Sequence, residues 1–177
     1  MLSGFVKAKE GLRKVFAQPS YDELMSHGAY FLQNGRPDMA EGYFRRAIGQ
    51  QDSPEPWRLY AWSLLDQGKM GMRHLDERIW YEHDGTSYRD HVRLGHKKVA
   101  SLEPSAENYY EAALIALSVR DLKDVMSYLA KALESDPDDS VLIRIGRLTK
   151  TLKMDGLTKI VEKLSTEREL SVHLYPL

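Results

Sequence analysis

Apolar and small residues recur along the chain at two intervals, and each interval carries one kind of predicted helix. One set of positions repeats after 33 residues and again after 52, whereas a second set repeats after 52 residues and then after 33. The first set comprises Leu24, His27, Gly28, Phe31 and Gly35; Trp57, Tyr60, Ala61, Leu64 and Gly68; and Tyr109, Ala112, Ala113, Ala116 and Arg120. The second comprises Ala40, Phe44, Ala47 and Ile48; Val92, His96, Val99 and Ala100; and Val125, Leu129, Ala132 and Leu133. A period of roughly 34 residues predicts stacked helical hairpins, because one hairpin cannot bury its apolar face alone.

Capping and turn residues divide this pattern into helices. Ser20 and Glu23 have the spacing of a capping box, which predicts a helix start. Asn34-Gly35 predicts a turn into a second helix over about 37–50. Later boundaries are predicted at 52–54, 67–68, Ser87, Leu102, Pro104, Asp121 and Pro137. No stretch alternates with period two, so the sequence predicts no sheet.

Small residues stand opposite bulky ones at the repeated positions, as close helix packing requires. Leu24-x-x-His27-Gly28-x-x-Phe31 followed by Ala40-x-x-x-Phe44-x-x-Ala47 resembles the tetratricopeptide repeat. The segment "NYYEAALIALSVRDLKDVMSYLAKALESDP" resembles another copy, and Pro104 closes the middle one. The resemblance covers roughly residues 21–153, apart from one insertion. It implies an all-α fold, a right-handed α-α superhelix of three stacked hairpin repeats.

The break in the pattern lies inside the second copy. The interval between equivalent first-helix positions is 52 residues, instead of 33, from copy two to copy three. The interval between second-helix positions is 52 residues from copy one to copy two. Both hold only if the extra residues fall inside copy two, between Gly68 and Thr86. The insertion, about 69–86, places Met72, Leu75 and Ile79 on one helical face, which predicts an extra helix. Three interpretations stay open: a surface that contacts a partner, a lid on the protein's own core, or a prolonged preceding helix.

The pattern continues in a weaker form after Pro137. Leu142, Ile145 and Gly146 fall 33 residues beyond Tyr109, Ala112 and Ala113, and a helix after 155–156 lacks the small and aromatic positions. We expect a degenerate repeat that caps the array. The whole chain, 1–177, is predicted as one domain: an amphipathic helix at 1–19, repeats at 20–53, 54–104 and 105–137, a capping repeat at 138–168 and a tail at 169–177.

The composition is that of a globular chain. Of 177 residues, 42% are hydrophobic and 29% charged, enough for one domain of ordinary size. A net charge of −1 gives no overall attraction for nucleic acid or an anionic membrane, and without cysteine there is no disulfide or thiolate site. No apolar stretch reaches the roughly 18 residues of a membrane span. The charged start lacks a secretory apolar core, so we expect a cytoplasmic protein.

The resemblance implies a binding groove lined by the inward face of each first helix. The mapped positions are Asp22, Met25, Ala29 and Leu32; Glu55, Arg58, Trp62 and Leu65; Glu107, Tyr110, Leu114 and Leu117; and Ser140, Ile143, Arg147 and Lys150. From these we predict a partner-binding groove of Met25, Ala29, Leu32, Arg58, Trp62, Leu65, Tyr110, Leu114, Leu117, Arg147 and Lys150, apolar in its middle and basic at one end. Two alternatives stay open: Trp62 and Leu65 are core residues, or the chain's own terminal helix fills the groove.

The family's carboxylate clamp for acidic chaperone tails is not reproduced. Met25 and Ala29 stand where a lysine and an asparagine are needed. The groove therefore favours an extended or helical protein segment with apolar anchors and an acidic group near Arg147 and Lys150.

Other candidate sites are weaker. Four histidines, His74, His83, His91 and His96, are interleaved with acidic residues, and imidazole with carboxylate suits a metal. None has the i, i+4 spacing of a helical zinc pair, and His96 aligns with Phe44 and Leu129, which favours a packed histidine. Arg144, Arg147, Lys150 and Lys153 step along one helix, and a solvated face is the default reading against a phosphate or nucleic-acid partner. No phosphate loop or catalytic arrangement appears, so we expect no enzyme, no metal and no cofactor.

Phe5, Ala8, Leu12 and Val15 form an apolar stripe among basic residues at the N-terminus. This helix is read as a cap on the first repeat, as a homodimerisation helix or as a weak membrane-surface anchor.

The main hypothesis is a non-enzymatic adaptor, or a chaperone-like protein similar in size and repeat number to the tetratricopeptide chaperones of bacterial type III secretion. The alternative is a structural subunit of a permanent homo- or hetero-oligomer, and an enzyme comes third.

Overall fold

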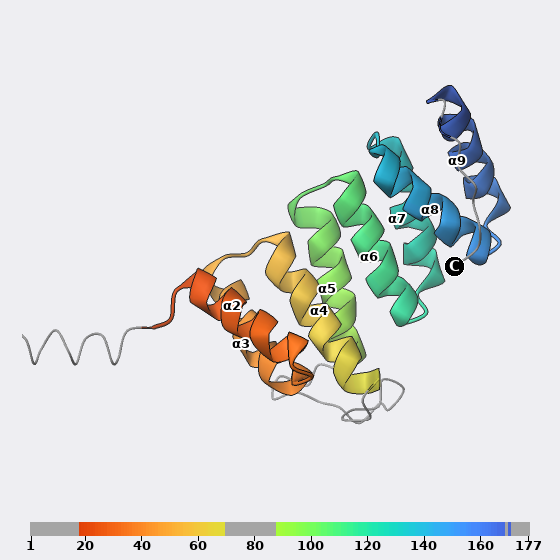
Figure 1. The fold of residues 1–177 in the computed structure, drawn as a ribbon. Helices are drawn as coiled ribbons and strands as arrows, with labels where there is room; N and C mark the ends of the chain where they lie inside the picture. The colour runs from red at the N-terminus through yellow and green to blue at the C-terminus, as the bar shows by residue number, and fades with distance from the viewer. Residues whose placement is uncertain (1–17, 70–87, 169, 171–177) are drawn as a thin grey trace, which may run out of the picture.

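The computed structural model describes residues 18–69, 88–168 and 170, which form eight helices and no strand (Figure 1). The helices are α2 (Tyr21–Gln33), α3 (Pro37–Gln50), α4 (Pro54–Lys69), α5 (Tyr88–Leu102), α6 (Ala106–Ser118), α7 (Leu122–Glu134), α8 (Asp139–Thr151) and α9 (Asp155–Glu167). The all-α prediction is confirmed for this part of the chain. The predicted insertion, the N-terminal helix and the tail lie almost wholly outside the described residues.

Side-chain caps begin three of the first helices. Ser20 accepts the backbone N–H of Glu23, whose carboxylate accepts the N–H of Ser20 in return, so the predicted capping box is confirmed. At the starts of α6 and α8, the side chains of Ser105 and Asp138 accept the backbone N–H of Asn108 and Val141. These helices start where a polar side chain satisfies an N–H that the helix itself leaves unpaired.

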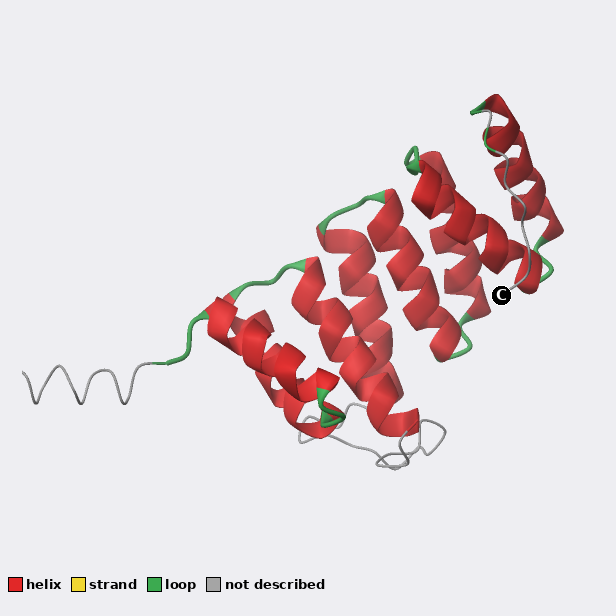
Figure 2. Ribbon diagram, viewed as in Figure 1, coloured by secondary structure: helices red, strands yellow, loops and turns green. Residues whose placement is uncertain are grey.

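The turns that join first to second helices share one geometry. Gly35, Arg120 and Lys153 all adopt a left-handed backbone, with φ of 67°, 58° and 55°. In each turn the next residue donates its N–H to the carbonyl five residues back, at 2.8–2.9 Å. Short loops therefore join these hairpins in the same way (Figure 2). The equivalent position in the second copy, Gly68, lies inside α4.

The helices pack mainly on their neighbours in sequence. Each of α2 to α6 packs against the next helix, and α8 packs against α9. Additional packing joins α4 to α6, α6 to α8 and α7 to α9. The array therefore runs in chain order from α2 at one end to α9 at the other (Figure 1).

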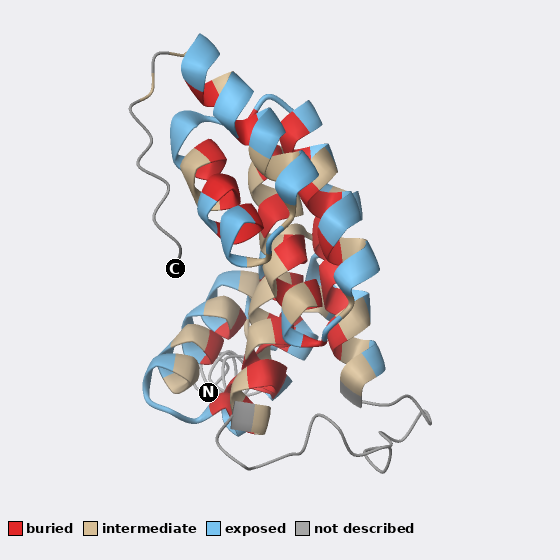
Figure 3. Cartoon of the chain, turned by 90° about the vertical axis from the view of Figure 1, so that its right-hand side faces the viewer, coloured by how far each residue is buried: buried red, intermediate tan, exposed pale blue. Residues whose placement is uncertain are grey.

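The core follows the repeated positions and runs through the array between the helices (Figure 3). Phe44 is fully buried, and a Cβ added to Gly28 would lie 2.5 Å from its Cε1 atom. A Cβ on Gly95 would lie 2.8 Å from the Cβ of Ala61. The predicted pairing of a small residue with a bulky one is confirmed for Gly28 and Phe44, and it lets the two helices approach closely.

Candidate interaction surface

The predicted groove residues all lie on first helices. They are Met25, Ala29 and Leu32 on α2; Arg58, Trp62 and Leu65 on α4; Tyr110, Leu114 and Leu117 on α6; and Arg147 and Lys150 on α8. We call this set the first-helix face. Because α4 packs on α6 and α6 on α8, the last three helices bring their members together, whereas α2 joins the array mainly through α3.

Burial divides the first-helix face into two groups. Leu65 is 1% exposed and Tyr110 5%, so both side chains are part of the core and present almost no surface to a partner. Trp62, Leu114 and Leu117 are half-buried and pack against that core, as do Met25 and Leu32. The alternative that assigns Leu65 to the core is correct, whereas Trp62 is seated on the core with part of its surface open.

An ion pair joins α6 and α8 within this face. Arg144 Nη1 donates to Glu107 Oε1 at 3.1 Å, and a second bond joins Nη2 to Oε2. The guanidinium carbon of Arg144 also lies 4.9 Å from the ring centroid of Tyr110. Bidentate pairing and a cation–π contact hold this arginine in one geometry. Arg144 therefore differs from the exposed Arg147 and Lys150 of the predicted basic row.

A glutamate that the sequence reasoning missed lies at the centre of the face. Burial raises the pKa of Glu111, and the nearby charge of Glu107 adds to this shift. The positive charges of Arg58 and Arg144 and a hydrogen bond with Trp62 act in the opposite direction. The available signal was helical spacing, because Glu107, Glu111 and Leu114 fall on one side of α6.

A second group of exposed apolar side chains lies on the second helices. Met39 on α3, Leu94 on α5, Leu122 and Met126 on α7 and Ile160 on α9 are each more than 40% exposed. None of the five belongs to the groove predicted from the sequence. Isolated apolar residues are common on protein surfaces, but these five provide controls for any claim about the first-helix face.

The histidine cluster divides in the structure. His74 and His83 lie outside the described residues. The Nδ1 atom of His91 is 3.2 Å from the hydroxyl of Tyr60, and His96 is fully buried with its ring edge-on to Tyr128. The predicted packing of the His96 side chain in the core is confirmed.

Within residues 18–69, 88–168 and 170, no helix has the length and hydropathy needed to cross a membrane. No protein-family model, curated protein or solved structure matches the chain.

Proposed function

We propose that this protein is a non-enzymatic, cytoplasmic interaction protein, an adaptor or chaperone, that holds a segment of a partner protein along the first-helix face. One observation supports this proposal above the others. Trp62, Leu114 and Leu117 are half-buried apolar side chains on two helices that pack directly against each other. The tetratricopeptide resemblance, with its right-handed superhelix, gives this face the position of a binding groove.

The physical case rests on preorganisation. A half-buried tryptophan on a packed helix keeps one orientation, so a partner gains contact area without ordering a mobile side chain. Trp62 is held by the core below it and by its hydrogen bond with Glu111. Tryptophan is among the residues most enriched in binding hot spots.

Charge indicates the partner's chemistry. Glu107 is paired with Arg144, so its charge is largely compensated inside the face. Arg147 is exposed one turn further along α8. The segment that fits best carries apolar residues for α4 and α6 and an acidic group for Arg147.

A permanent assembly subunit is the second candidate. The observation that favours it is the exposed apolar group on the second helices, with Leu94, Leu122 and Met126 more than 40% exposed on α5 and α7. In such an assembly these side chains are covered by a neighbouring subunit.

Affinity capture with paired alanine variants separates the two candidates. The double variant Trp62→Ala, Leu114→Ala truncates the first-helix face, and the matched control Leu94→Ala, Met126→Ala truncates the second-helix group. We expect the first double variant to lose the partner and the control to keep it, with both retaining the helical circular-dichroism spectrum. Loss of the partner only in the control favours the assembly subunit, and equal recovery by both variants refutes the proposed function.

A further inference from the structure

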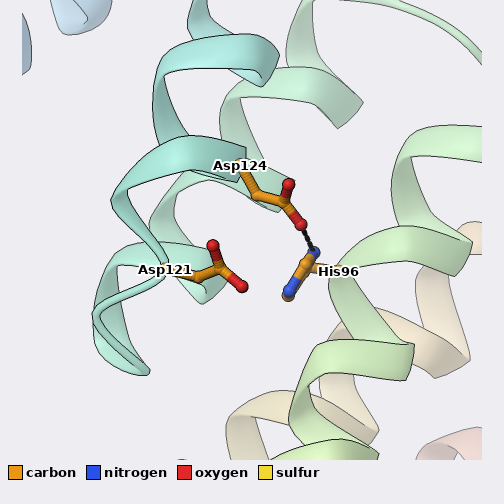
Figure 4. A group of neighbouring side chains, drawn as sticks. All are labelled: His96, Asp121 and Asp124. Carbon is orange, nitrogen blue, oxygen red and sulfur yellow. Dashed lines mark ion pairs between the residues drawn. The ribbon is translucent and has the colours of Figure 1, made fainter.

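A histidine and two aspartates meet between α5 and α7, away from the first-helix face. His96 comes from α5, Asp121 precedes α7 and Asp124 lies in its first turn. One ligand atom from each of the three residues lies within 4.8 Å of the others. Figure 4 shows both carboxylates and the imidazole directed toward the gap between the two helices.

The imidazole has one ring nitrogen whose hydrogen-bonding capacity is unused. His96 is 0% exposed, and its Nδ1 atom is 3.1 Å from the hydroxyl of Tyr128. Its Nε2 atom is buried and has no hydrogen-bond partner among the described residues. An unpaired buried nitrogen is unfavourable, so a ligand at this atom removes an existing cost.

The carboxylate of Asp121 is not used by its own helix. Ser20, Ser105 and Asp138 each accept a backbone N–H at a helix start, but Asp121 at the start of α7 makes no such bond. Its charged contact with Arg93 Nε spans 3.7 Å, which is too long for a hydrogen bond. The side chains of Asp121 and Asp124 are 24% and 29% exposed, so an ion can reach them from solvent.

We propose that His96, Asp121 and Asp124 bind one divalent transition-metal ion of the Zn²⁺ class and thereby link α5 to α7. One nitrogen with two oxygen donors suits Zn²⁺ or Co²⁺ better than Mg²⁺ or Ca²⁺, which prefer oxygen ligands only. Bonds of about 2.1 Å place neighbouring ligand atoms roughly 3.4 Å apart, so the two carboxylates close by about an ångström around the ion. A water molecule fills the fourth position.

The surroundings suit such an ion. When Nε2 binds the ion, the N–H at Nδ1 donates a hydrogen bond to the Tyr128 hydroxyl oxygen, and a bond of this kind orients a metal-binding histidine. The two carboxylates and Arg93 sum to a charge of −1, so a divalent cation is attracted. The site is specific to one junction, because Phe44 and Leu129 occupy the position of His96 in the other copies.

Binding of Co²⁺, followed by Zn²⁺ competition, tests this proposal on the tag-free full-length chain after EDTA treatment. The test variant is Asp121→Asn, Asp124→Asn, whose partly exposed side chains keep their size. The control is Asp155→Asn in the first turn of α9, an exposed aspartate that belongs to no group of metal-ligand side chains among the described residues. Nitrogen-15 spectra of the histidine rings show whether the ion reaches an imidazole.

We expect the wild type and Asp155→Asn to bind one Co²⁺ per chain with visible absorption bands, and Zn²⁺ to displace it and raise the melting temperature. The double variant should bind at least about tenfold more weakly and show no melting shift. Equal binding by the double variant, or no binding by the wild type, overturns the proposal. Neither result depends on partner capture, so this test stands apart from that of the proposed function.

Discussion

Gly28 shows how a single residue sets the distance between two helices. Its α-carbon faces the ring of Phe44, and a Cβ there would lie within 3 Å of three ring carbons. Gly42 lies on α3, the helix that carries Phe44, but nothing lies within 4 Å of a Cβ added at that position. The α2–α3 hairpin therefore tolerates a side chain at Gly42, which is exposed, but not at Gly28, where the ring of Phe44 occupies the space.

Replacing each of these glycines by alanine tests this difference. Gly28→Ala should lower the free energy of unfolding by about 1–3 kcal/mol, because Phe44 must leave its position. Gly42→Ala should raise it by about 0.5–1 kcal/mol, because alanine favours an exposed helix interior. Urea unfolding measures both, and Phe44→Leu in the Gly28→Ala background should recover part of the loss. Equal effects at the two positions would show that Gly28 is not a packing residue.

The left-handed turns give a second test at the level of single residues. Gly35 adopts φ of 67°, and no atom lies within 4 Å of a Cβ added there. Lys153 adopts φ of 55° at the equivalent turn. Gly35→Ala should destabilise the protein by about 1 kcal/mol, because a Cβ disfavours this conformation. Lys153→Gly should stabilise it by a few tenths to about 1 kcal/mol. Thermal unfolding of both variants checks the signs, and a destabilised Lys153→Gly contradicts the shared geometry.

At the scale of elements, the helix boundaries could be predicted because local signals determine them. Ser20 with Glu23 and Asn34-Gly35 each act within one turn of backbone, and the helix predicted over about 37–50 is α3 (Pro37–Gln50). Contacts between helices carry no such signal. Glu107 and Arg144 are 37 residues apart, and the meeting of His96 with Asp121 depends on how α7 lies against α5. The burial of Leu65 and Tyr110 also comes from neighbouring helices.

The packing of α6 on α4 gives a pH dependence that can be measured. The pKa of Glu111 is raised in the folded protein, so the native state holds its proton more tightly than the unfolded chain. Stability from this group is therefore present below the ordinary glutamate pKa and is lost as pH rises through the raised pKa. Glu111→Gln should flatten stability against pH in that window and keep the hydrogen bond with Trp62.

Urea unfolding from acidic to neutral pH, with the exposed Glu55→Gln as control, measures this effect. The difference in stability between Glu111→Gln and the wild type should grow with rising pH. A difference that stays constant, or that the control reproduces, contradicts the assignment of a buried carboxyl at this position.

On the scale of the whole molecule, stability should vary along the array because each helix relies mainly on its neighbours. The last hairpin is fastened at its ends by Arg168, whose Nη1 donates to the carbonyl of Pro137 at 2.5 Å and whose Nη2 pairs with Asp136. Arg168→Met should speed hydrogen exchange in α9 and leave α4 unchanged. Uniform acceleration in both helices argues against a separate end segment.

The change of interval in the sequence predicts an insertion at about 69–86, almost all of which lies outside the described residues, so it stays a prediction. Periodicity reveals such a phase shift without any knowledge of structure. The identity of the partner cannot be predicted from periodicity. Under the proposed function, half-buried side chains such as Trp62 indicate where a partner segment lies and what chemistry it needs, but many sequences satisfy that description.

Site-specific photo-crosslinking tests the central claim most directly, because it reports where the partner lies. A photoreactive amino acid replaces Leu117 on the first-helix face, and in a separate protein it replaces Met126 on α7. Our account predicts a partner crosslink from position 117 and none above background from position 126. A crosslink from position 126 alone, or equal crosslinks from both, would contradict the claim that the first-helix face binds the partner.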